Sequence, residues 1–243
     1  MRKAALLSLI LLACPAALAW PTGASAARAG AGKAPVLVEL FTAQGCGKCK
    51  DANAYFGKLA DRPGVLGLTY SVDYWDYLGW ADTFARPEFA ERQKAYVARL
   101  KLREPYTPQV VVDGRDEAQG LKTTEVDKLV RAAAAAPRDP PEIHFVGNRR
   151  VDVGSARAPK GGADVWLIRY DPRAVEVAVK AGDNRGETVV ERNVVREMTR
   201  LGAWKGKPQA FRLPPPEEEG LKTVVVLQGP KGGRVLAVGQ AKG

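Results

Sequence analysis

Two cysteines separated by two residues, Cys46 and Cys49, point most directly to chemistry in this 243-residue chain. A thiolate attacks disulfides, and a cysteine at a helix N-terminus is stabilised as thiolate by the helix dipole and free backbone N–H groups. Cys46 follows an apolar run and precedes a helix-forming run, and Lys48 and Lys50 add positive charge. We therefore expect Cys46 to attack a substrate disulfide and Cys49 to resolve the resulting mixed disulfide. The two cysteines would form a redox-active disulfide, and we expect no other cofactor and no metal.

The N-terminus has the features of a secretory signal. A short basic start precedes an apolar run from Ala4 to Leu18, and small residues follow at positions that signal peptidase accepts, with cleavage expected near Ala19 or Ala26. We assign residues 1–26 to the signal peptide and a flexible start, and we expect a periplasmic or secreted protein. The alternative is a lipoprotein signal in which Cys14 is lipidated, and the protein contacts a membrane only in that case.

The cysteine count favours redox exchange or metal ligation over a structural role. The chain has three cysteines, and removal of the signal leaves Cys46 and Cys49. Disulfides persist in exported proteins, but a bridge across two residues closes a loop too small to restrain an unfolded chain much.

Residues 34–136 alternate strand and helix patterns in the order of a thioredoxin fold, which predicts an α/β thioredoxin-like domain. Cys46 falls after the first strand, and Thr107-Pro108 falls where that fold has a cis proline before its third strand. The expected strands are 34–41, 65–72, 109–112 and 117–119, and the expected helices are 47–60, 87–101 and 123–136.

A proline-rich boundary at 137–142 precedes a segment of short strands punctuated by Gly, Asp and Pro, from which we expect an all-β sandwich-like domain over 143–243. The expected strands are 143–146, 149–153, 163–170, 174–180, 188–195, 209–213, 222–228 and 234–239.

Glu39 interrupts the apolar first strand, and a buried carboxylate must find a partner or stay protonated. One interpretation is a proton relay for the cysteine pair, since thioredoxins have a carboxylate in a similar place. The other is an edge position that reaches solvent or a cap.

Three further residues are candidates for substrate binding. A cis peptide at Thr107-Pro108 exposes neighbouring backbone groups to an extended peptide beside Cys46. Trp75 belongs to an aromatic loop at 73–80, which either binds a peptide or forms a small satellite core.

The net charge of +10 does not indicate a nucleic-acid partner, because the excess avoids the cysteine region. Residues 1–33 carry +4, residues 34–136 are balanced, and residues 137–243 carry +6. This diffuse basicity is typical of a solvated surface rather than of a groove that reads nucleic acid. The single histidine, His144, lies beyond the boundary, and we expect a structural role for it.

Several motifs together resemble the DUF1223 family of exported bacterial proteins, which are thioredoxin-like at the front. They are Val-Glu-Leu-Phe-Thr-Ala-Gln-Gly-Cys-Gly-Lys-Cys (38–49), Val-Asp-Tyr-Trp-Asp-Tyr-Leu-Gly-Trp (72–80), Arg92-Gln93 with Tyr96, Tyr-Thr-Pro-Gln-Val-Val-Val-Asp-Gly (106–114), and 193–197 with 201–204. The resemblance implies a bacterial envelope or secreted protein and supports both expected domains, and it names no substrate.

The leading hypothesis is an exported thiol-disulfide oxidoreductase that acts on protein or small-molecule thiols and disulfides. It requires that Cys46 is not sealed within apolar packing and lies near the Thr107 carbonyl. The alternative is a non-catalytic thioredoxin-like module that binds a soft metal such as Cu(I) or a protein partner in the envelope. In a third interpretation, the β-sandwich at 143–243 is an adhesive or partner-docking surface, and the redox domain is secondary.

Overall fold

The computed structural model describes residues 34–241, and the elements of its first half follow the expected order closely. The expected signal, with Cys14, Ala19 and Ala26, lies outside these residues. Within the described part, no helix is both long and apolar enough to cross a membrane. The elements are β1 (Val36–Thr42), α1 (Cys49–Ala60), β2 (Val65–Ser71), the 3-10 helix η1 (Asp76–Leu78), α2 (Pro87–Leu100), β3 (Gln109–Val112), β4 (Asp116–Gln119) and α3 (Thr123–Ala135).

The second half consists of strands, two of which are much longer than expected. They are β5 (Ile143–Val146), β6 (Arg150–Val153), β7 (Ala163–Ala178), β8 (Thr188–Trp204), β9 (Gln209–Arg212), β10 (Lys222–Gln228) and β11 (Val235–Gln240). The expected strands 163–170 and 174–180 are therefore parts of one strand, β7. Its pairing with β8 shifts between Asp171 and Ala174, and Pro172 lies at this irregularity, where a strand tolerates proline.

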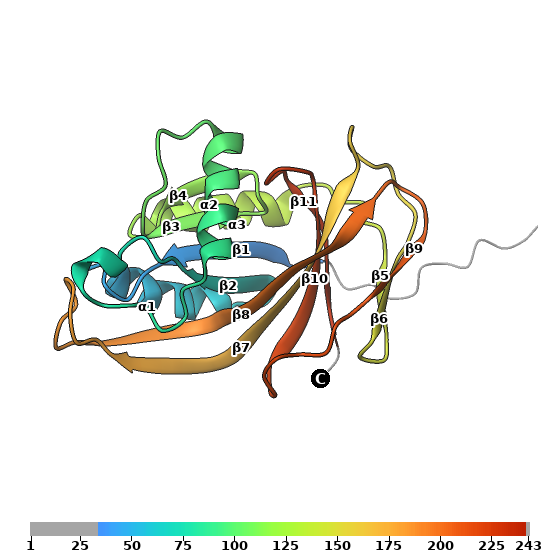
Figure 1. The fold of residues 1–243 in the computed structure, drawn as a ribbon. Coiled ribbons are helices and arrows are strands. Elements are labelled where there is room, and N and C mark those ends of the chain that lie inside the picture. Colours follow the sequence, from blue (N-terminus) through green and yellow to red (C-terminus); the bar gives the residue numbers. More distant parts are fainter. Residues whose placement is uncertain (1–33, 242–243) are drawn as a thin grey trace, which may run out of the picture. The chain divides into compact units, whose positions relative to one another are not determined.

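Strands from both halves form one eight-stranded sheet in the order β11-β10-β7-β8-β2-β1-β3-β4 (Figure 1). β8 runs parallel to β2 beside Thr69, whose hydroxyl donates to the carbonyl of Arg192 at 2.6 Å. The Asn193 amide donates to the carbonyl of Gly67 at 2.8 Å. The expected sandwich at 143–243 is thus not separate, because long strands of this segment extend the sheet of the first half.

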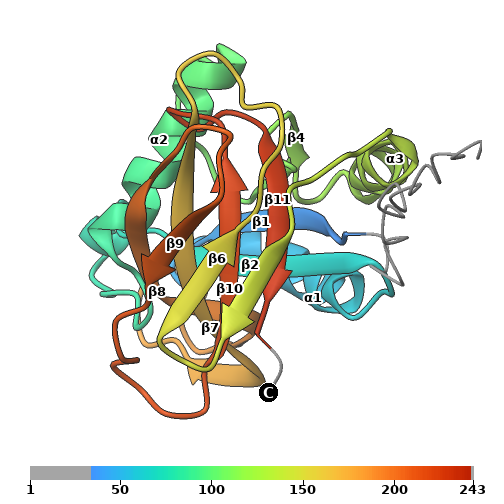
Figure 2. The same cartoon turned by 90° about the vertical axis from the view of Figure 1, so that its right-hand side faces the viewer.

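A second layer covers the other end of the long strands. β5, β6 and β9 form a three-stranded sheet, which Figure 2 shows in front of β7 and β10. Val151 and Phe211 from this sheet share a buried cluster with Val165, Leu167 and Leu227 of the large sheet. Sandwich-like packing therefore occurs at this end.

The helices of the first half lie on opposite faces of the sheet. Val38 and Leu40 of β1 pack in one cluster with Phe56 of α1. Phe41 packs in another cluster with Phe89 of α2. Because successive side chains of a strand point to opposite faces, the face of each β1 residue decides which helix it meets.

Candidate functional site

The cysteine pair lies between β1 and α1 and is joined as a disulfide. Cys49 is the first residue of α1, and its backbone N–H donates to the carbonyl of Cys46 at 3.0 Å. Cys46 thus lies in the turn that leads into the helix. The expected placement of this sulfur near a helix N-terminus is confirmed.

Both cysteines are nevertheless covered. Cys46 is 2% exposed and Cys49 is 0% exposed, whereas Gly47 and Lys48 between them are exposed. Both cysteines belong to an apolar cluster that includes Phe41. The leading hypothesis requires a Cys46 sulfur that is not sealed within apolar packing, and this structure does not meet that requirement. The segments that cover the disulfide therefore become part of the site.

One covering segment comes from the second half of the chain, and the sequence contained no local signal for it. The loop between β7 and β8 lies beside the start of α1 (Figure 1). Asn184 of this loop donates from its side-chain amide to the carbonyls of Gln44 at 2.8 Å and Cys46 at 2.9 Å. The backbone N–H of Asp183 donates to the carbonyl of Gly45 at 3.1 Å.

The Thr107-Pro108 peptide is cis, as expected. The Trp75 indole donates to the Thr107 hydroxyl at 2.7 Å. A Cβ built on Gly45 would also lie 3.8 Å from the Cβ of Trp75, so Trp75 lies between the turn before Cys46 and the cis proline. Trp75 is partly buried and anchors its loop, which favours the satellite-core interpretation for this side chain.

Gly120 sets the distance between the cis proline and α1. A Cβ at this position would lie 2.9 Å from the Cβ of Pro108 and 3.1 Å from that of Ala52, which belongs to α1. Pro108 and the helix that begins at Cys49 are therefore neighbours across this glycine.

We expect Gly120→Ala to lower the free energy of unfolding by about 1–3 kcal/mol, because the added methyl overpacks this contact. Urea denaturation measures the effect. The matched control is Gly57→Ala within α1, where the new Cβ would meet Arg192 at an ordinary 3.7 Å. That change should be neutral or stabilising by up to about 1 kcal/mol, since alanine favours helix. Equal losses in the two variants would contradict this account of Gly120.

Glu39 is fully buried, and its carboxylate pairs with side chains of α2. Its Oε1 accepts from Arg92 Nε at 2.7 Å, and its Oε2 accepts from the Tyr96 hydroxyl. Gln228 of β10 donates to the same hydroxyl at 2.9 Å. Within the described residues no hydrogen bond joins Glu39 to Cys46 or Cys49. Neither expected interpretation fits, since the carboxylate forms a buried ion pair with α2 rather than a relay or a contact with solvent.

The electrostatics of this group follow from its burial. Burial by itself lowers the pKa of Arg92, but the adjacent Glu39 carboxylate outweighs this and holds the pKa above its usual range. Burial raises the pKa of Tyr96 well above its ordinary value. The Arg92 guanidinium also lies 5.3 Å from the centre of the Tyr96 ring. The cluster therefore contains one ion pair and a neutral phenol.

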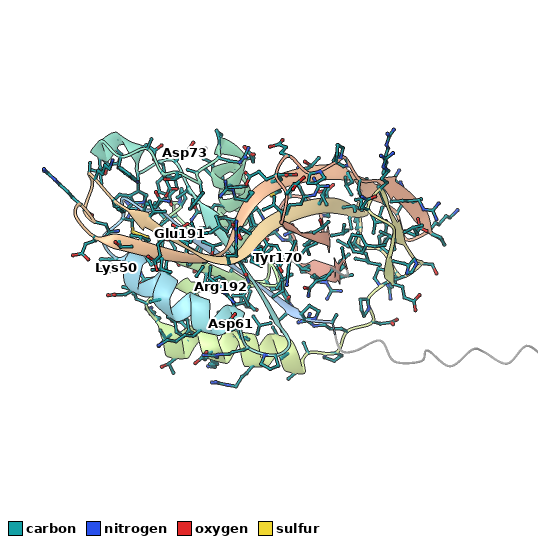
Figure 3. All side chains as sticks on the ribbon, turned by 90° about the horizontal axis from the view of Figure 1, so that it is seen from below. Lys50, Asp61, Asp73, Tyr170, Glu191 and Arg192 are labelled. Atoms are coloured by element: carbon teal, nitrogen blue, oxygen red, sulfur yellow. A yellow bond between two sulfur atoms is a disulfide. The ribbon has the colours of Figure 1, made fainter. Side chains whose placement is uncertain are left out.

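A second buried carboxylate, Glu191 of β8, was missed by the sequence analysis. It is 0% exposed and accepts from the Ser71 hydroxyl at 3.4 Å. Burial, together with the charge of Asp82, raises its pKa to about 8. Figure 3 labels Glu191 on β8 and Lys50 on α1. An acidic residue in an alternating strand pattern reads as solvent-facing, so its burial was not predictable from the local pattern.

Two further polar side chains, those of Thr42 and Asn53, are buried beside the first turns of α1. The Thr42 hydroxyl donates to Asn53 Oδ1 at 2.8 Å, and Asn53 lies one turn beyond Cys49 on α1. Within the described residues, Asn53 Nδ2 and Glu191 Oε1 have no hydrogen-bond partner. A second polar group therefore lies in the interior, beside the first turns of α1.

The remaining candidates do not form a metal centre. Residues 34–241 contain no group of three or more His, Cys, Asp or Glu side chains placed to hold a metal ion. His144 lies on β5, where it pairs in register with Asp152.

A family model described as a protein of unknown function (DUF1223) matches residues 37–228, most of the chain. The chain belongs to the DUF1223 family. The matched region of this DUF1223 protein includes the disulfide and the cis proline from the first half of the chain. It also includes Asn184 and Glu191 from the second half. No curated protein matches the chain.

Two solved structures are similar to this DUF1223 protein. A structural genomics target from Agrobacterium tumefaciens is 30% identical, with a TM-score of 0.70 over 86% of this chain and 95% of that chain. HBP35 of Porphyromonas gingivalis is 13% identical, with a TM-score of 0.55 over 87% of this chain and 76% of that chain. At that identity the second similarity concerns the fold alone.

Proposed function

We propose that this protein is an exported thiol-disulfide oxidoreductase with a thioredoxin-like unit at 34–136. The observation that carries the proposal is the Cys46–Cys49 disulfide at the β1–α1 junction, with a cis proline packed across Gly120 from the first turns of α1. The helix N-terminus favours the thiolate that disulfide exchange needs. Chain export is part of the proposal and would place the pair where disulfides persist.

The proposed reaction begins with a dithiol, in a protein or a small molecule, as the reductant. One substrate thiolate attacks Cys46 Sγ, which forms a mixed disulfide and releases Cys49 as a thiolate that takes up a proton. The second substrate thiolate attacks the substrate sulfur of the mixed disulfide and releases Cys46, which takes up the other proton. The substrate loses two electrons and two protons, and the protein disulfide gains them. Run in reverse, Cys46 attacks a substrate disulfide and Cys49 resolves it.

Substrate docking is proposed at the cis proline. The described hydrogen bonds leave the backbone N–H and carbonyl of Thr107 free to pair with an extended chain, while its hydroxyl is held by Trp75. Trp75 would thus orient the docking segment through this hydrogen bond. Glu39 has no role in this scheme, because its carboxylate is paired with Arg92.

The test is trapping of the mixed disulfide. In Cys49→Ser, Cys46 that has been activated by a thionitrobenzoate group should form a stable covalent adduct with a reduced peptide that has a single cysteine, since neither partner then has a second thiol to break the mixed disulfide. In Cys46→Ser, Cys49, the first residue of α1, should form the adduct more slowly after the same activation, because the proposed scheme gives it the resolving role and not the role of the sulfur that an incoming thiol reaches. Intact mass spectrometry measures the adducts. Equal adduct formation in the two variants, or wild-type exchange no faster than that of an unstructured Cys-Gly-Lys-Cys peptide, would overturn the proposal.

The burial of the disulfide supports a second candidate, a non-catalytic binding module in the bacterial envelope that takes a soft metal or a protein partner. Such a module would keep Cys46 and Cys49 joined under native conditions, or bind Cu(I) through them once they are reduced. Metal content by mass spectrometry, with and without prior reduction, separates the candidates. A metal-free dithiol that reoxidises readily supports the oxidoreductase.

A further inference from the structure

The loop between β7 and β8, residues 179–187, is a folded unit rather than an open connection. The backbone N–H of Val179 donates to the carbonyl of Glu187 at 2.9 Å, and that of Gly186 donates to the carbonyl of Val179 at 2.9 Å. The backbone N–H of Glu187 donates to the carbonyl of Asn184 at 2.9 Å. Because these bonds lie within the loop, it can move away from α1 without breaking them. We call residues 179–187 the tip.

Polar contacts hold the tip against the cysteine segment. Asn184 is 4% exposed, and its amide binds the carbonyls on either side of Gly45, as described above. At the surface, Lys50 of α1 pairs with Glu187. Hydrogen bonds to backbone carbonyls are replaced by water when the contact opens, so each contributes modestly to the closed state.

The tip also closely approaches the glycines on either side of Cys46. A Cβ at Gly182 would lie 3.1 Å from the Cα of Gly45, and one at Gly47 would lie 3.1 Å from the Cβ of Asp183. The tip therefore lies directly against the turn that contains Cys46. Neither sulfur is exposed in this arrangement, and a thiolate needs access along the S–S axis to attack.

We propose that the tip is a gate over the Cys46–Cys49 disulfide and that Asn184 is the positioning residue that holds it closed. The inference rests on the proposed function, since it concerns access to the same disulfide. Opening exposes Cys46 to an incoming thiolate, and closing protects the disulfide from other thiols. A small dithiol needs a smaller opening than a thiol on a folded protein, so the gate also selects reductants by size.

The test measures the rate at which dithiothreitol reduces the disulfide of the full chain, with acid quenching, alkylation and mass spectrometry. Asn184→Ala should raise this rate on the order of tenfold at every dithiothreitol concentration, because two hydrogen bonds of the closed state are lost. Glu187→Gln should raise it about two- to threefold at low salt and not at high salt, since its ion pair with Lys50 is exposed. Neither variant alters a cysteine or the Thr107-Pro108 peptide.

The matched control is Thr69→Val, which removes another side-chain hydrogen bond to a backbone carbonyl, that of Arg192, away from the tip. This variant should lose stability in urea without faster reduction under native conditions. Equal rates in wild type and both tip variants would overturn the gate, as would acceleration by Thr69→Val equal to that by Asn184→Ala. These outcomes are distinct from failure of the proposed function, because dithiothreitol reports access to the disulfide whether or not the trapped peptide adduct forms.

Discussion

Arg92→Met is expected to lower the free energy of unfolding by about 3–5 kcal/mol, because it leaves the Glu39 carboxylate buried without a cation. Arg92 and Glu39 are both almost completely buried, and water cannot replace the lost partner. The same change removes the contact of the guanidinium with the Tyr96 ring. Since the cluster joins α2 to β1 and, through Gln228, to β10, we expect the loss to affect the whole described unit.

Urea denaturation of wild type and variant measures this loss. The matched control is Arg62→Met, which removes an ion pair with Asp127 at 2.5 Å on the surface. That change should cost no more than about 1 kcal/mol. The double variant Glu39→Gln with Arg92→Met should recover part of the stability, since no charge is then left buried. Similar losses of unfolding free energy for Arg92→Met and Arg62→Met would show that the buried ion pair contributes no more to stability than the surface pair.

Glu191→Gln is expected to remove a strong pH dependence of stability. The folded protein raises the pKa of Glu191 from 4.5 to about 8, chiefly through burial and then through the charge of Asp82. The folded state therefore holds this proton more tightly than the unfolded chain does. The stability that neutral Glu191 contributes to the folded state is fully present below pH 4.5 and is lost as the pH rises through about 8.

Between these limits the wild-type free energy of unfolding should fall by up to about 1.4 kcal/mol per pH unit from this group. Glutamine cannot ionise, so Glu191→Gln should be more stable than wild type at pH 9 by a few kcal/mol, on the order of the full linkage. Near pH 5 the two proteins should differ little. Urea denaturation across this pH range gives the difference.

The control for this prediction is Glu176→Gln, an exposed carboxylate on β7 whose register partner on β8 is Val190, next to Glu191. Its stability should follow the wild-type pH curve. A wild-type curve parallel to that of Glu191→Gln would contradict the assignment of a neutral Glu191. Burial also raises the pKa of Asp82, whose titration is linked to that of Glu191. The difference between the wild-type and Glu191→Gln stability curves therefore reports on the two carboxyl groups together.

Local patterns in the chain predicted the elements around the disulfide closely. The cis peptide at Thr107-Pro108 is expected from its place in the order of elements. The apolar run before Cys46 forms β1, and the helical spacing after Cys49 forms α1. These features depend on residues within a few positions of one another, through backbone propensity and side-chain periodicity. For the same reason the strands at 143–146 and 222–228 have the expected bounds.

The order of strands in space could not be obtained in this way. A pairing such as Thr69 with Val194 depends on which edge of β2 is free and on the length of β7 and β8. It carries Asn184 onto the cysteine turn and buries Glu191. The chemistry of the cysteine pair is thus predictable from neighbouring residues of the sequence. The segment that covers the pair and the burial of Glu191 depend instead on contacts between residues more than a hundred positions apart, where hydrophobic burial and sheet pairing override local pattern.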